Sequence, residues 1–133
     1  MADLSNPTVQ KILQSTTIAH LATIGPDGRP QSSPMAFHWD GEYIKLTTTV
    51  NRQKYQNIKR DPHIALSITA VDNPYTYAEF RGVVERIEED PAAAFYLTLA
   101  ERYGIPPRDY HGDPRLILYV KVRRIVGQNL EDR

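Results

Sequence analysis

Two turn signals in the first third of the chain, Gly25-Pro-Asp-Gly28 and Asp40-Gly41, constrain its fold more than any other feature. Each lies between short runs of apolar, aromatic and β-branched residues, and Asp-Gly in that setting is a strong hairpin signal. We therefore expect residues 17–24 to pair with residues 29–39, and these to lead into a strand over residues 42–50. The expected result is a three-stranded antiparallel meander.

Three more β-rich runs follow, over residues 63–70, 75–88 and 116–122. The sequence thus predicts a mainly β fold of six antiparallel strands with α connections. We expect these strands to close into a small β-barrel, because closure removes exposed strand edges. The chain has 133 residues, of which 41% are hydrophobic, which is enough for one core and too little for two. We expect a single domain over residues 1–133.

The connections carry helix signals. Asn6-Pro7 and Asp90-Pro91 are typical of helix starts, because a side-chain oxygen can cap the helix and proline is tolerated at its first position. Gly104 is typical of a helix end. The expected helices follow Pro7 and cover residues 51–60 and 92–103. Residues 105–114 are rich in Pro and Gly and are expected to form an irregular loop, which is either a lid or ordinary surface.

The second expected strand is unusual, because Pro30 and Pro34 fall on one side of the pleat and cannot donate hydrogen bonds. We expect strand pairing to be broken there. The backbone beside the small Ser32 and Ser33 would then be open to the edge of a flat heteroaromatic ring. An ordinary edge strand with a bulge is the alternative. The residues of opposite parity, expected in the core or in a subunit interface, are Met35, Phe37 and Trp39.

Five basic residues and no acidic one lie between positions 45 and 60, in a chain whose formal net charge is zero. Arg52 and Lys54 fall where the expected strand gives way to the expected helix. Unpaired N–H groups and the positive end of the helix dipole gather at such a point, so a phosphate fits there, assisted by the hydroxyls of Thr48 and Thr49. We interpret the cluster as the binding site for the anionic group of a cofactor. A solvated basic helix face is the alternative.

Composition excludes several classes of function. Lys and Arg total 16 and Asp and Glu total 16, which argues against nucleic-acid binding through a basic face. The absence of cysteine excludes disulfides and thiolate metal sites. The first residues lack the pattern of a signal peptide, and no apolar run is long enough to span a bilayer. We therefore expect a soluble, cytoplasmic protein with neither a nucleic-acid nor a membrane partner.

Catalysis by side chains finds little support in the sequence. It shows no Ser-His-Asp order, no paired carboxylates at helical spacing and no Gly-rich phosphate loop. The histidines are scattered, and we interpret them as strand or loop residues rather than metal ligands; they are His20, His38, His63 and His111. We expect a bound cofactor, positioned by the protein, to carry any chemistry.

Three segments of the chain carry a resemblance to a known family. They are Ile18-Ala-His-Leu-Ala-Thr23, Gly28-Arg-Pro-Gln-Ser-Ser-Pro34, and Arg52-Gln-Lys54 followed by Asn57-Ile-Lys-Arg-Asp-Pro62. Together they resemble the pyridoxamine 5′-phosphate oxidase-like split β-barrel superfamily, and more closely its F420-dependent reductases. The similarity extends over almost the whole chain. It implies a six-stranded antiparallel split β-barrel of the FMN-binding type, and a homodimer in which each of two cofactor sites takes residues from both chains.

Residue by residue, the resemblance implies a site for the deazaflavin coenzyme F420. Arg52 and Lys54 match the positions that hold the cofactor phosphate, with Thr48 or Thr49 assisting. Tyr77 matches a position that reaches the site from the partner subunit. The backbone that the resemblance places against the deazaflavin ring is that of Gln31, Ser32, Ser33, Pro34 and Met35.

The spacer between the two cations indicates which cofactor is bound. FMN-binding members of this family tend to show an adjacent Arg-Lys pair, so Gln53 between Arg52 and Lys54 favours F420 over FMN. Lys59 or Arg60 is expected to attract the polyglutamate tail of that coenzyme.

The resemblance implies an F420-dependent oxidoreductase that transfers a hydride from the reduced deazaflavin to an electron-poor conjugated acceptor, such as a quinone, an enone or a biliverdin-like molecule. Two alternatives share the fold: an FMN-dependent flavoprotein, and a non-catalytic protein that stores or senses a flavin-like ligand. A barrel that stacks single-stranded nucleic acid on Tyr and Trp is disfavoured by the neutral charge. The proton for the product would come from water or from a nearby Tyr or His.

Overall fold

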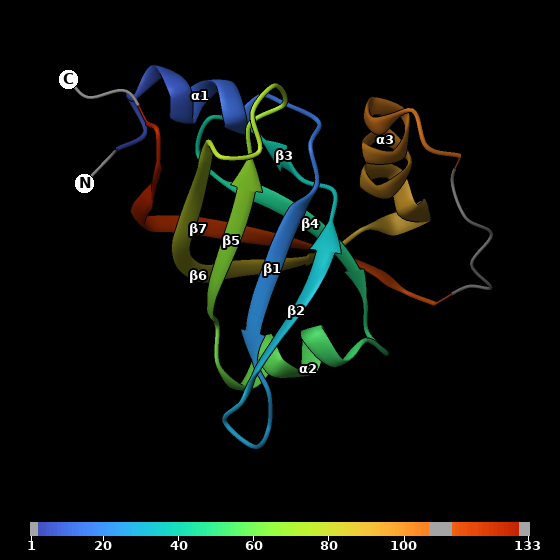
Figure 1. Cartoon of the computed structure of the whole chain (residues 1–133). Coiled ribbons are helices and arrows are strands. Elements are labelled where there is room, and N and C mark those ends of the chain that lie inside the picture. Colours follow the sequence, from blue (N-terminus) through green and yellow to red (C-terminus); the bar gives the residue numbers. More distant parts are fainter. Residues whose placement is uncertain (1–2, 107–112, 131–133) are drawn as a thin grey trace.

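The computed structural model describes residues 3–106 and 113–130 (Figure 1). Within these residues the elements are α1 (Pro7–Leu13), β1 (Ala19–Ile24), β2 (Pro30–Met35), β3 (His38–Trp39), β4 (Ile44–Thr49), α2 (Gln53–Arg60), β5 (His63–Thr69), β6 (Tyr77–Glu89), a 3-10 turn (Pro91–Ala93), α3 (Ala94–Tyr103) and β7 (Arg115–Gln128). No helix in this part of the chain is long and apolar enough to cross a membrane. In Figure 1, β1, β2 and β5 run in front of the long strands β6 and β7, and α3 stands to one side.

The seven strands of the described residues form one antiparallel sheet in the order β2-β1-β5-β6-β7-β4-β3. β2 and β3 lie at opposite ends of this order, although only Ala36 and Phe37 separate them in sequence. The sheet must therefore curve round until its two edges approach each other, which is the geometry of a barrel open along one seam. The predicted mainly β, barrel-like fold is confirmed. The expected strand over residues 29–39 divides into β2 and β3, so the sheet has seven strands rather than six.

The expected three-stranded meander is wrong. β1 and β2 form the first hairpin as predicted, from the pair Ala19–Met35 to the pair Ile24–Pro30. β3 and β4 pair at the other edge of the sheet, because the chain crosses the open seam between β2 and β3. A hairpin signal identifies neighbours on either side of a turn, but it does not show that two consecutive strands lie on opposite edges of a closing sheet.

The prediction of broken pairing in β2 is also wrong. The ladder with β1 runs without a register shift across both Pro30 and Pro34. β2 is an edge strand, and the backbone positions where Pro30 and Pro34 lack an N–H group face away from β1. Because β2 has no strand on that side, no ladder hydrogen bond is lost. The break occurs instead at Ala36 and Phe37. The edge of β2 is therefore open because β2 is the last strand of the sheet, and not because its pairing with β1 is lost.

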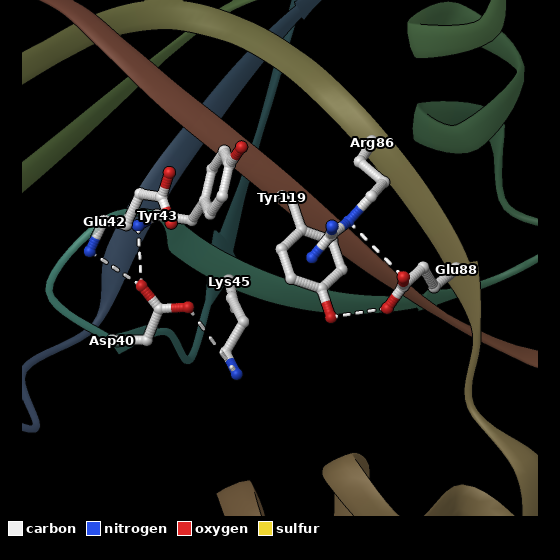
Figure 2. A network of polar contacts seen from close by, with 7 residues as sticks. All are labelled: Asp40, Glu42, Tyr43, Lys45, Arg86, Glu88 and Tyr119. Atoms are coloured by element: carbon white, nitrogen blue, oxygen red, sulfur yellow. Dashed lines mark hydrogen bonds and ion pairs between the residues drawn. The ribbon is translucent and has the colours of Figure 1, made fainter.

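The second hairpin turns one residue later than its Asp-Gly signal suggests. The Asp40 N–H donates to the Tyr43 carbonyl at 3.1 Å, which leaves Gly41 and Glu42 as the turn, with Gly41 at φ 97°. Figure 2 shows the Asp40 carboxylate accepting from the N–H groups of Glu42 and Tyr43, at 2.8 and 2.7 Å. Asp40 therefore stabilises the turn from its first position.

The hydrophobic core fills the inside of the barrel, and α1 covers one end of the barrel. Asn6 caps α1 as predicted, because its side-chain oxygen accepts from the N–H groups of Thr8 and Val9 at 2.9 and 3.1 Å. α1 buries Val9, Ile12 and Leu13 against the strands, and each such side chain contributes roughly 1.5–3 kcal/mol. Strand residues with exposed fractions of 1% or less include Leu21, Leu46, Leu66, Phe80 and Leu118, and Phe37 between β2 and β3 is also fully buried.

The third helix starts later than expected. Residues Pro91–Ala93 form a 3-10 turn, in which Ala92 and Ala93 have φ of 56° and 54°, and α3 begins at Ala94. The predicted cap Asp90 still acts on this start, since its carboxylate accepts from the N–H groups of Phe95 and Tyr96 at 2.9 and 3.0 Å. The predicted end at Gly104 is confirmed by its φ of 64°.

Candidate cofactor site

A pocket of about 610 Å³ lies between β4, the start of α2 and one face of α3. This volume is in the range of pockets that bind cofactors and other small molecules. The predicted residues that line it are Pro34, Met35, Thr48, Thr49, Arg52 and Lys54. The other lining residues are Ala36, Thr47, Asn51, Tyr96, Leu99, Ala100, Tyr103, Ile105, Pro106, Asp113 and Arg115.

The start of α2 gives the pocket its positive charge. Arg52 occupies the N-cap position, and an arginine side chain has no acceptor with which to cap the helix. The first N–H groups of α2 and the positive end of its dipole thus add to the charges of Arg52 and Lys54. Burial lowers the pKa of Lys54, and the neighbouring Arg52 charge lowers it further. This group of donors and cations matches the chemistry of a phosphate.

A buried amide fixes α2 against the sheet. Asn57 is fully buried, and its side-chain N–H₂ donates to the Thr23 hydroxyl at 3.0 Å and to the Gln31 side-chain oxygen at 2.7 Å. Gln53 donates to the Asn57 oxygen at 2.9 Å. Asn57 thereby joins α2 to β1 and β2, whereas the contact of Gln53 lies within α2. Neither Gln31 nor Gln53 is among the described residues that line the pocket. Their observed contacts position the helix that carries Arg52 and Lys54.

The end of β4 supplies hydroxyl groups next to these cations. Thr48 and Thr49 are buried, and both line the pocket. The Thr49 hydroxyl hydrogen-bonds to the side-chain oxygen of Asn51, whose N–H₂ group donates to the Asp113 carboxylate at 3.3 Å. This chain of contacts joins the end of β4 to the residues that precede β7.

Tyr103 holds the backbone where β2 ends. Its hydroxyl accepts from the Phe37 N–H at 3.1 Å and lies 2.8 Å from the Thr17 carbonyl and 3.3 Å from the Phe37 carbonyl, to which it can donate. Burial raises the pKa of Tyr103, although the contact with the Phe37 backbone works in the opposite direction. The segment Pro34–Ala36, which lines the pocket at the sheet edge, is therefore fixed on its C-terminal side by α3.

One face of α3 forms a wall that we did not predict from the sequence. Tyr96, Leu99, Ala100 and Tyr103 recur with helical spacing and all line the pocket. Their periodicity is visible in the sequence, but the same pattern is typical of a helix face packed on a core. Only the position of α3 beside the sheet shows that this face borders a pocket.

Arg115 is a further pocket cation that we did not predict. It is the first residue of β7 and pairs in register with Thr49. Its guanidinium lies 3.9 Å from the centre of the Tyr96 ring, and its Nε donates to the Thr47 hydroxyl at 3.3 Å. Because Arg115 is distant in sequence from the basic cluster, its place in the site depends on the pairing of β7 with β4.

The remaining predicted residues lie elsewhere in the described part of the chain. Ser32 and Ser33 are on β2 outside the pocket lining, and Lys59 and Arg60 are at the other end of α2 from Lys54. The Lys59 ammonium lies 5.2 Å from the centre of the Tyr55 ring, and Arg60 donates to the Ile24 carbonyl. The lid prediction for residues 105–114 falls mainly on residues 107–112, which lie outside the described residues.

Tyr77 is not among the described residues that line this pocket. It is the first residue of β6 and pairs with Gln128, whereas the other end of β6 pairs with Leu116 beside the pocket. Tyr77 is half-buried at the end of the sheet where β5 and β6 meet.

A network of charged and aromatic residues braces β4 and α3 next to the pocket. The Lys45 ammonium lies 3.9 Å from the Asp40 carboxylate and 5.1 Å from the centre of the Phe95 ring in α3. Figure 2 shows how the network continues, with Tyr119 donating to Glu88 at 2.6 Å and Arg86 lying over the Tyr119 ring at 4.0 Å. These contacts help to hold the pocket wall in place.

Known proteins share this fold across nearly the whole chain. The family model for pyridoxamine 5′-phosphate oxidase matches residues 5–129. A solved structure described as an F420 reductase is 44% identical with a TM-score of 0.83, and the match covers 88% of this chain and 94% of that chain. A conserved hypothetical protein from Mycobacterium tuberculosis is 28% identical with a TM-score of 0.72, covering 96% of this chain and 84% of that chain.

The same fold is also found in a protein that binds another ligand. A heme binding protein from Mycobacterium smegmatis is 23% identical with a TM-score of 0.71, covering 100% of this chain and 57% of that chain. At this identity the likeness concerns the fold alone. The match of the family model and the 44% identity to the F420 reductase confirm the resemblance found in the sequence. The chain belongs to the pyridoxamine 5′-phosphate oxidase family.

Proposed function

We propose that this protein is an F420-dependent oxidoreductase, which passes a hydride from the reduced coenzyme to an electron-poor conjugated acceptor such as a quinone, an enone or a biliverdin-like molecule. The observation that carries the proposal is the pair of cations at the start of α2, Arg52 and Lys54, which line one pocket with an exposed strand edge. The 44% identity to a protein described as an F420 reductase supports the choice of coenzyme.

The residues of the pocket fit this coenzyme. Arg52, Lys54 and the first N–H groups of α2 would hold its phosphate, with the hydroxyls of Thr48 and Thr49 beside them. The backbone of Pro34–Ala36 at the sheet edge would meet the edge of its ring. The bound coenzyme supplies the hydride.

The protein's own contribution is binding and orientation. Tyr103 fixes the backbone that would contact the ring, and Asn57 fixes the helix that would contact the phosphate. Leu99 and Ala100 on α3 present apolar surface that excludes water from part of the pocket. These residues would hold the reactants in one geometry, and such positioning accelerates transfer between two bound molecules.

We also propose that the protein acts in the cytoplasm as a homodimer with shared sites. The absence of cysteine is consistent with a reducing compartment. Tyr77 does not line the pocket of its own chain, which fits a role for Tyr77 at the site of a partner chain. Lys59 and Arg60, at the far end of α2, would contact only a long extension of the ligand, such as the coenzyme's polyglutamate tail.

Titration of the purified protein with F420 and with FMN tests the proposal. We expect tighter binding of F420, and Lys54→Ala should weaken it by roughly 1–3 kcal/mol, the scale of a hydrogen bond to a charged partner. The control is Arg124→Ala, an exposed cation on β7 away from the pocket. Unchanged F420 affinity in Lys54→Ala would contradict the assigned phosphate position. Preference for FMN would favour an FMN-dependent flavoprotein instead.

A screen of acceptors with the bound coenzyme then separates an enzyme from a ligand carrier. We expect the absorbance of the reduced coenzyme to change when quinones, enones or biliverdin-like molecules are added. Tight binding without turnover of any acceptor would identify the non-catalytic alternative.

A further inference from the structure

A second pocket, of about 710 Å³, lies between α1 and the connection from β5 to β6. In Figure 1 both elements lie at the top of the view. The volume is in the range of pockets that bind small molecules. This pocket shares no described lining residue with the candidate cofactor site, so its contacts are not explained by the proposed function.

The connection that forms one wall of this pocket is fixed by hydrogen bonds. The Thr76 N–H donates to the Asn73 carbonyl at 3.0 Å, and the Ala70 N–H donates to the Thr76 carbonyl at 2.8 Å. The Tyr75 N–H donates to the side-chain oxygen of Asn73 at 2.9 Å, and the Gln128 side chain donates to the Tyr75 carbonyl at 3.0 Å. The wall is therefore held in one shape before any ligand binds, which lowers the cost of ordering it on binding.

The hydroxyl of Thr76 opens into this pocket without a partner. Thr76 is only 8% exposed, and its side chain makes no hydrogen bond within residues 3–106 and 113–130. Every fully enclosed side-chain nitrogen or oxygen of these residues has a partner, so the Thr76 hydroxyl is not fully enclosed by protein. Because Thr76 lines the pocket, its hydroxyl can donate to a ligand there or accept from one.

Two opposite charges line the same pocket from different walls. Lys11 lies in the last turn of α1, and Asp72 lies in the connection between β5 and β6. Both residues are exposed, and in the described part of the chain neither side chain forms an ion pair or a hydrogen bond. Ile12 and Val71 add apolar surface to the two walls. A ligand here would meet a cation on one wall, an anion on the other and apolar surface beside both.

We propose that this pocket binds a small zwitterion of the amino-acid or dipeptide class, with its carboxylate at Lys11, its ammonium at Asp72 and a further polar group at the Thr76 hydroxyl. Each charged end would then form a charge-assisted hydrogen bond. An aliphatic side chain of the ligand would contact Ile12 and Val71. A ligand with a single charge would leave Lys11 or Asp72 without a partner, so the pocket should favour zwitterions.

Three forms of one dipeptide test the proposal without the coenzyme. Glycyl-leucine carries both charges, N-acetylglycyl-leucine lacks the ammonium, and glycyl-leucinamide lacks the carboxylate. Binding to isotope-labelled protein is followed by NMR at the amide signals of Ala70, Asn73 and Thr76. We expect saturable shifts of these signals. Each singly charged form should bind about three- to tenfold more weakly than glycyl-leucine, which lies between the scale of an exposed ion pair and that of a charge-assisted hydrogen bond.

Single substitutions assign each end of the ligand to its partner. Lys11→Met should bind glycyl-leucine and glycyl-leucinamide equally, and Asp72→Asn should bind glycyl-leucine and N-acetylglycyl-leucine equally. Thr76→Val keeps the shape of the side chain but removes the hydroxyl, so it should weaken all three forms and retain the order among them. Lys59→Met is the matched control for Lys11→Met, because Lys59 is also exposed in the last turn of a helix and does not line this pocket. Thermal unfolding of each variant confirms that it is folded.

The proposal is overturned if glycyl-leucine gives no saturable shifts at this pocket, or if it shifts the signals of Arg52 and Lys54 instead. It is also overturned if Lys11→Met and Asp72→Asn discriminate among the three forms as the wild type does. Free leucine then separates the two members of the ligand class. Leucine that binds at least as tightly as glycyl-leucine identifies a site for single amino acids, and tighter binding of glycyl-leucine identifies a site for dipeptides.

Discussion

Lys54 is held in a place that disfavours its charge in the free protein. It is half-buried beside Arg52 and lies in the first turn of α2, where the helix dipole also opposes a cation. Its lowered pKa means that, between the folded and unfolded pKa values, the unfolded chain binds more protons than the folded protein. Stability therefore rises with pH across that window, and below it the charged Lys54 is a net cost to folding.

Replacing Lys54 should consequently stabilise the free protein and lower its affinity for the ligand. We expect Lys54→Met, which keeps the aliphatic stem, to raise the Tm measured by differential scanning fluorimetry at neutral pH. Lys59→Met is the matched control, because Lys59 is exposed in the last turn of the same helix, where a cation is favourable, and it should give no gain. A lower Tm for Lys54→Met than for the wild type would show that the Lys54 charge is stabilised in the free protein.

The residue-level parts of the site differ in how far the sequence could predict them. Arg52 and Lys54 were predictable because they follow a β-rich run directly, and local sequence determines a helix start. Arg115 was not, because its approach to the pocket depends on the register between β4 and β7. The backbone of Gln31 was predicted to lie against a ligand, and the contact of its side chain with Asn57 was not predicted, because these two residues are distant in sequence.

At the scale of elements, the ends of helices were the most predictable features. Asn6 and Gly104 act as expected, because capping is a local interaction. The 3-10 turn before α3 was not predicted, since Ala92 and Ala93 carry no signal for their positive φ. The pocket wall formed by α3 was not predicted, because its apolar face has the same periodicity as a helix face packed on a core.

The hydroxyl of Tyr103 joins α3 to the break between β2 and β3, and removing it tests that link. Tyr103→Phe keeps the ring that packs edge-on against Phe37, with centroids 6.4 Å apart, but leaves the Phe37 N–H and the Thr17 carbonyl without this partner. We expect a loss of about 1–3 kcal/mol in the free energy of unfolding, measured by urea titration.

The same variant should also affect the ligand. Because Pro34–Ala36 lies directly before Phe37, its backbone should move, and F420 affinity should fall more than in a variant of similar stability that is altered far from the pocket. Ile64→Val, in the core next to β6, provides that comparison. Equal F420 affinity in Tyr103→Phe and Ile64→Val would show that Tyr103 does not position this segment.

At the scale of the molecule, the fold class was predictable and the topology was not. Alternation and turn chemistry identified most strands, but the sheet order depends on closure of the barrel, which places β2 and β3 on opposite edges. The same closure brings the start of α2, α3 and the beginning of β7 around one pocket. No pattern within a single segment contains that information.

The proposed homodimer leads to a prediction about mixtures of two variants. If each site takes Lys54 from one chain and Tyr77 from the other, then Lys54→Ala and Tyr77→Ala should each weaken F420 binding when prepared alone. A mixed dimer of the two variants has one site with both changes and one site with neither. Mixing equal amounts by refolding should therefore restore tight binding in about one quarter of all sites, measured by fluorescence titration.

This expectation rests on the resemblance, which matches Tyr77 to a position that reaches the site from the partner subunit, and Tyr77 is not among the described residues that line the pocket of its own chain. Co-refolding each variant with itself is the control, and it should restore nothing. If Tyr77→Ala binds F420 as tightly as the wild type, Tyr77 has no part in the site. If both variants bind weakly and the mixture gains no tight sites, each pocket is complete within one chain and the shared-site arrangement is wrong.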